Sequence, residues 1–83
     1  MARRVWLIYN NLIGEYLLDD SPGKGKNRSH FGSLDDFVVG LSVSLPKDRR
    51  VVAMVDVDFP EGALNRVKEA LSDHKIVYER EEK

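Results

Sequence analysis

The chain has 83 residues and a mass of 9.5 kDa, which suits one small domain with a single hydrophobic core. Hydrophobic residues make up 42% and charged residues 33%, which argues against a disordered or collagen-like chain. Thirteen lysines and arginines face 14 aspartates and glutamates, and the net charge of −1 argues against a general DNA-coating protein. The absence of cysteine excludes disulfides, thiolate catalysis and cysteine-ligated metals.

The apolar runs are too short to cross a membrane. The longest are residues 5–9 and 51–55, against the ~20 residues of a transmembrane helix. The basic first residues precede no signal-peptide hydrophobic region. We therefore expect a soluble domain, cytoplasmic if the chain is complete and periplasmic if it was excised from a membrane-anchored protein.

The first part of the chain predicts a hairpin followed by a loop. Residues 5–9 are rich in β-branched and aromatic side chains, which favours a strand, and the asparagines at 10 and 11 indicate a turn. Residues 12–18 are typical of a second strand. Residues 19–32 are rich in glycine and cations, and we expect a flexible basic loop there. A short extra strand would fit at residues 29–31, but we assign none.

Capping residues and apolar spacing predict two helices. Ser33 can cap the first, with Asp36 completing a capping box, and Pro46 stops it. Asp58 is a suitable N-cap for the second, and Glu61 completes its box. Between the helices, residues 51–55 are apolar on both faces, which indicates a central strand. Residues 76–78 form a last strand before a charged tail at 79–83.

These elements predict one α+β domain over residues 1–83, in the order β-β-α-β-α-β. Two helices would pack on one face of a four-stranded mixed sheet. The strands at 51–55 and 76–78 would be joined by a right-handed parallel crossover. The edge at which the first hairpin pairs stays open.

The basic loop is the first candidate site. Lys24, Lys26, Arg28 and His30 would form a mobile finger for nucleic acid or an acidic protein. The glycines beside the lysines do not form a P-loop, because the G-x-x-x-x-G-K-[ST] spacing is missing. The competing interpretation is a solvated linker.

Three aromatic residues of the hairpin are the second candidate. Trp6, Tyr9 and Tyr16 would offer a stacking platform for single-stranded nucleic acid, which needs aromatics beside cations. We favour the alternative, a sheet core or a dimer surface. The exposed sheet edges of so small a domain also favour a homodimer.

Asp56 and Asp58 are the candidate metal ligands. They share one face of an extended segment, and they resemble the D-x-D of Toprim nucleases and primases, in which carboxylates hold a divalent metal. The glutamate that should follow an earlier strand is missing. The structural interpretation is that Asp58 caps the helix and Asp56 pairs with an arginine or with solvent.

A second resemblance rests on residues 55–62, V-D-V-D-F-P-E-G, followed by Val67 and Ala70-Leu71. This segment is similar to the A-D-x-D-x-P-Y-G … V … A-L stretch of the ExbD/TolR biopolymer-transport family. The resemblance implies a non-enzymatic periplasmic domain that dimerises and binds partners beside a proton-driven motor. The family's N-terminal transmembrane helix, with its proton-carrying aspartate, is absent from this sequence; if the chain is complete at 83 residues, the motor role cannot carry over and only the fold would.

We therefore predict a non-enzymatic protein-interaction domain of ExbD/TolR type that needs no cofactor, binds a protein partner and forms a homodimer. The alternative is a stand-alone protein, of phage or mobile-element type, that binds nucleic acid or inhibits a host enzyme through the basic loop. A Toprim-like metal-dependent nuclease is the third hypothesis.

Overall fold

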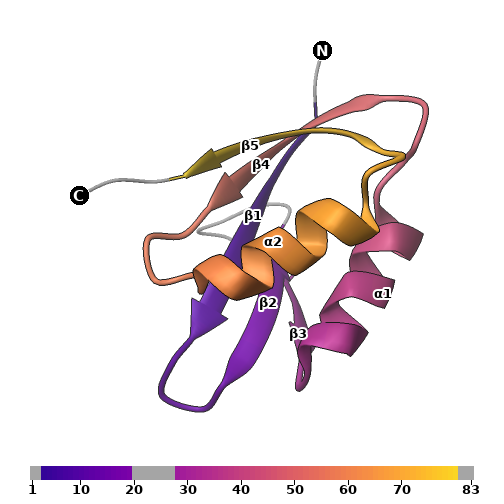
Figure 1. The fold of residues 1–83 in the computed structure, drawn as a ribbon. Helices are drawn as coiled ribbons and strands as arrows, with labels where there is room; N and C mark the ends of the chain where they lie inside the picture. Colours follow the sequence, from indigo (N-terminus) through magenta and orange to yellow (C-terminus); the bar gives the residue numbers. More distant parts are fainter. Residues whose placement is uncertain (1–2, 20–27, 81–83) are drawn as a thin grey trace.

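The computed structural model describes residues 3–19 and 28–80, which form five strands and two helices. The five strands form one mixed sheet in the order β3-β2-β1-β4-β5 (Figure 1). Strand β1 is parallel to β4, β4 is parallel to β5, and β2 is antiparallel to both β1 and β3. The elements are β1 (Arg3–Asn10), β2 (Glu15–Asp19), β3 (Arg28–Phe31), α1 (Leu34–Ser44), β4 (Arg50–Val55), α2 (Glu61–Ala70) and β5 (Lys75–Arg80).

The α+β class, the two helices and the mixed sheet are confirmed, but the predicted four strands and the order β-β-α-β-α-β are wrong. The additional strand is β3, which lies in the segment predicted to be a loop. Its sequence carries little strand signal, because only Phe31 is a large apolar residue. Pairing with β2 and the contact of Phe31 with Phe37, at 5.6 Å between ring centroids, stabilise it instead. Asp19, the first residue of the predicted loop, ends β2 instead, and residues 20–27 lie outside the described residues.

Both helices lie on the same face of the sheet (Figure 1). Alternate residues of β1 and β4 point toward them, because side chains alternate across a strand. The resulting core combines one face of the sheet with the apolar stripes of α1 and α2. Its least exposed members are Val5, Leu7, Phe37, Leu41, Val51, Ala53, Val55, Phe59 and Val67.

The opposite face of the sheet is covered by neither helix. It carries Trp6 and Ile8 from β1, Val52 and Met54 from β4, and Val77 from β5, all half-buried or exposed. This explains why β4 is apolar on both sides: it lies between β1 and β5, one side contributes to the core, and the other contributes to an apolar strip on the open face.

One of the two predicted helix caps is confirmed and the other is wrong. Ser33 caps α1 as expected, since its Oγ accepts a hydrogen bond from the backbone N–H of Asp36 at 3.2 Å. The predicted cap of α2 is wrong: Pro60 occupies the N-cap position and no side chain caps that helix end. The chain turns first, with the N–H of Phe59 bonded to the carbonyl of Asp56 at 3.0 Å. This turn buries Phe59 in the core and leaves Asp58 exposed.

The helices are short. They have 11 and 10 residues, and in the described part of the chain no helix is long and apolar enough to span a bilayer.

A glycine pair tests the packing of β3 on α1. A Cβ added to Gly40 would lie 2.5 Å from the Phe31 ring, whereas one added to Gly62 in α2 would meet nothing within 4 Å. We expect Gly40→Ala to lower the free energy of unfolding by about 1 kcal/mol, because overpacking outweighs the gain in helix propensity. Gly62→Ala should raise it by about 0.5 kcal/mol. Urea denaturation measures both, and equal or greater stability of Gly40→Ala would contradict this packing.

Candidate functional site

The basic-loop candidates fall partly on β3. Lys24 and Lys26 lie outside the described residues. Arg28 donates two hydrogen bonds to Oδ2 of Asp19, at 3.1 and 2.9 Å, and the Asp19 side chain is fully buried. His30 is exposed, with Nδ1 at 3.8 Å from a carboxylate oxygen of Glu15. Arg28 and His30 therefore each lie beside a carboxylate, and Arg28 joins β3 to β2.

The aromatic candidates do not share one surface. Tyr9 and Tyr16 contact each other, with ring centroids 4.9 Å apart, and Tyr16 lies 5.5 Å from Phe37. Both tyrosines pack against the core on the helix-covered face. Trp6 points to the open face, because it occupies the other side of β1. The structure thus brings the two tyrosines together and separates them from Trp6.

The candidate metal ligands form part of the turn between β4 and α2. Asp56 donates its N–H to the carbonyl of Leu7 at 2.9 Å, and its carboxylate accepts from the N–H of Val57 at 2.9 Å. Asp58 is exposed. Within residues 3–19 and 28–80, no three histidine or acidic side chains are close enough to hold a metal ion. The contacts of Asp56 are those of a turn residue.

Cations from separate parts of the sequence meet where β1, β4 and β5 begin. Arg3 and Arg4 open β1, Arg49 and Arg50 lead into β4, and Lys75 opens β5. The parallel register aligns these strand starts, so that Arg50 is the direct neighbour of Lys75. We call these five residues the basic end.

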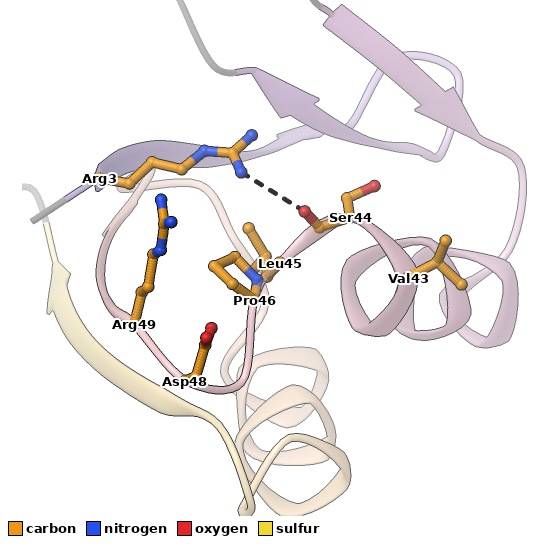
Figure 2. Close-up of a pocket in the computed structure, with 7 residues that line it drawn as sticks. All are labelled: Arg3, Val43, Ser44, Leu45, Pro46, Asp48 and Arg49. Atoms are coloured by element: carbon orange, nitrogen blue, oxygen red, sulfur yellow. Dashed lines mark hydrogen bonds between the residues drawn. The ribbon is translucent and has the colours of Figure 1, made fainter.

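A pocket of about 450 Å³ opens beside the basic end (Figure 2). Arg3 reaches across it from β1 and donates a hydrogen bond to the carbonyl of Ser44, at 3.5 Å, near the C-terminal end of α1. The lining combines two arginines with apolar side chains and one carboxylate. The lining residues are Arg3, Val43, Ser44, Leu45, Pro46, Asp48 and Arg49.

Most cations of the basic end have no carboxylate partner among the described residues. Within the described chain, Arg4, Arg49, Arg50 and Lys75 are exposed and form no ion pair. Other cations contact carboxylates: Arg28 with Asp19, Lys47 with Asp73, Arg66 with Asp35, and Arg80 with Glu61. Two cations directly opposite on neighbouring strands, as Arg50 and Lys75 are, destabilise a sheet. A bound anion would relieve that repulsion.

An exposed ion pair lies beside the basic end. Lys47 contacts Asp73 at 3.0 Å, which ties the segment before β4 to the turn before β5. Two hydrogen bonds lower the pKa of the Asp73 carboxyl below its usual value: the one from Lys47 has the larger effect and the one from His74 the smaller. His74 itself is buried, with Nδ1 at 3.0 Å from Asp73.

The basic end was not predicted, although the sequence holds a signal for it. The triplet Arg-Arg-Val occurs twice, at residues 3–5 and 49–51, each time at the start of an apolar strand. Only parallel pairing of those two strands makes the arginine pairs neighbours, and the sheet order behind that pairing was left open.

No protein-family model, curated protein or solved structure matches this chain. The resemblance to the ExbD/TolR family therefore stays a hypothesis.

Arg28 is expected to stabilise the fold. Arg28→Ala should lower the free energy of unfolding by about 2 kcal/mol, because it removes a partner of a buried carboxylate. Arg66→Ala is the matched control: its ion pair with Asp35 is exposed on both sides, and its loss should change stability by about 0.5 kcal/mol or less. Urea denaturation compares the two, and equal effects would contradict a structural role for Arg28.

Tyr78 gives the fold a dependence on alkaline pH. Its hydroxyl is buried without a hydrogen-bond partner in the described chain, and burial raises the pKa of Tyr78 to about 12 from 10.0. The pKa of the Tyr78 hydroxyl is higher in the folded than in the unfolded state. Its contribution to the free energy of unfolding is therefore complete below pH 10 and is lost as the pH rises toward 12. Tyr78→Phe should therefore lose less stability than the wild type over roughly the titration range of the hydroxyl, between pH 9.5 and 11.5. Urea denaturation at several pH values measures the loss. Identical losses would contradict the burial of the hydroxyl.

Proposed function

We propose that this chain is a non-enzymatic protein-interaction domain that binds an acidic segment of a partner protein at its basic end. The observation that carries the proposal is the set of exposed arginines, Arg4, Arg49 and Arg50, which form no ion pair within the described chain. They are concentrated at one edge of a protein whose net charge is −1. An acidic partner would be drawn to this edge even though the whole molecule is slightly acidic.

The pocket chemistry favours a peptide segment. Guanidinium groups bind carboxylates through paired hydrogen bonds, and Arg3 and Arg49 both line the pocket. Its apolar wall includes Val43, which is 80% exposed, and Val39 lies one turn earlier on α1 at 60% exposed. A segment that carries both acidic and apolar side chains would satisfy both parts of this surface.

Two earlier hypotheses are affected differently by the contacts. Nucleic-acid binding remains the alternative, since guanidinium groups also bind phosphates. Its proposed loop has Arg28 and His30 beside carboxylates, which weakens their attraction for phosphate. The ExbD/TolR resemblance agrees with a protein-binding role, and membership of that family remains a hypothesis.

Removal of two arginines tests the basic end. Arg49→Ala combined with Arg50→Ala should weaken binding of a fluorescent peptide of alternating glutamate and leucine at least about tenfold, with affinity falling as salt rises. The matched control is Arg66→Ala combined with Lys68→Ala, which removes the same charge from α2 and should change affinity less than about twofold. Fluorescence anisotropy measures both.

A single-stranded oligothymidine of similar charge forms the second arm of this experiment. Tighter binding of the oligonucleotide than of the peptide would overturn the proposal in favour of a nucleic-acid partner. Failure to bind the peptide, or equal weakening by the two double variants, would also overturn it.

A further inference from the structure

The last strand leaves one edge of the sheet open. β5 pairs with β4 on one side, and no described strand lies on its other side. It has six residues, against four for the opposite edge strand β3. An open edge presents backbone N–H and C=O groups that can pair with another strand, and in a homodimer the second strand is an identical one.

The alternation of side chains restricts how two β5 strands can pair. In a twofold antiparallel pair, opposed residues lie on the same face of the sheet, so each residue faces one an even number of positions away, or itself. Lys75, Val77 and Glu79 occupy the open face, whereas Ile76 and Tyr78 occupy the helix-covered face. The twofold axis must therefore pass through a residue and not between two.

We infer that two copies of the chain pair through β5, with the twofold axis at Val77. In this register Lys75 lies opposite the partner's Glu79, and Ile76 lies opposite the partner's Tyr78. Each opposite-charge pair occurs twice because of the symmetry, and Val77 meets its own copy on the axis. Opposite charges and aromatic–aliphatic contacts are the cross-strand pairs that stabilise antiparallel strands.

Neighbouring registers lack this complementarity. An axis at Tyr78 would place Val77 opposite the partner's Glu79 and Ile76 opposite the partner's Arg80. An axis at Ile76 would place Lys75 opposite the partner's Val77. Each arrangement sets a charge against an apolar side chain, so among these three registers only the one centred on Val77 pairs two described residues of opposite charge.

The other edge gives no such match. An axis at His30 of β3 would place this side chain opposite its own copy, and an axis at Ser29 would place Arg28 opposite the partner's His30. Neither brings opposite charges together. Self-pairing is therefore favoured at β5 and not at β3.

The same register relieves a repulsion within each copy. Arg50 and Lys75 are cations directly opposite each other on β4 and β5, and neither forms an ion pair in the described chain. The partner's Glu79 would lie on the far side of Lys75 from Arg50. Glu79 likewise forms no ion pair within the described chain, so both members of the new pair are available. This inference uses the β5 edge and does not depend on the acidic partner.

Charge exchange tests the register. Sedimentation equilibrium of the wild type should give twice the monomer mass of 9.5 kDa. Lys75→Glu and Glu79→Lys should each raise the dimer dissociation constant about tenfold or more, because each replaces two attractive pairs with two repulsive ones. The combined variant, Lys75→Glu with Glu79→Lys, exchanges the charges and should restore the dimer. Glu69→Lys, an exposed change on α2, is the control and should leave it unchanged.

Circular dichroism and thermal unfolding of each variant separate loss of the dimer from loss of the fold. A wild type that stays monomeric up to about millimolar concentration would overturn the inference. So would single reversals that leave the dimer intact, or a folded combined variant that fails to restore it. Peptide binding at the basic end is measured separately with Arg49→Ala, a residue outside both β4 and β5, which should leave the dimer unchanged.

Discussion

The structure depends on the parallel pairing of β1 with β4. This pairing sets Val5 beside Ala53 and Leu7 beside Val55, and these side chains join apolar residues of both helices in the hydrophobic core. Burial of that surface is the main force that stabilises so small a domain. The same pairing aligns the beginnings of the two strands, so the polar residues that precede each apolar run must lie at the same end of the sheet. The basic end is therefore a consequence of the core, and any sequence with cations before both strands would concentrate positive charge there.

Local signals could be predicted from the sequence, whereas features that depend on distant partners could not. Ser33 was predicted as a cap because its hydrogen bond to Asp36 spans only three residues. β3 was missed because its stability comes from β2 and from Phe37, and Asp58 was assigned the wrong role because burial of Phe59 sets the turn. For the candidate site, the arginine pairs were visible in the sequence, but their proximity required the sheet order.

The ion pairs divide the cations of this protein by function. Arg28 joins β3 to β2, Lys47 joins the loop before β4 to the turn before β5, and Arg80 joins β5 to α2. Each of these contacts connects two elements of the fold, and each places a carboxylate beside the cation. The arginines at the start of β4 connect nothing in the described chain and remain exposed. Like charges held close together at the basic end cost stability. For this reason the basic end, and not the cations that form ion pairs elsewhere, is the surface proposed for a partner.

The two proposed surfaces together constrain how an assembly would be arranged. Antiparallel pairing through β5 would extend the sheet to ten strands and leave the helices of both copies on one face, because the twofold axis is perpendicular to the sheet. The strand beginnings of the two copies would then point in opposite directions. The two basic ends would lie at opposite ends of the strands of the joined sheet, so a single short acidic segment could not reach both. A dimer of this form would connect two partner molecules and would not bind one partner twice.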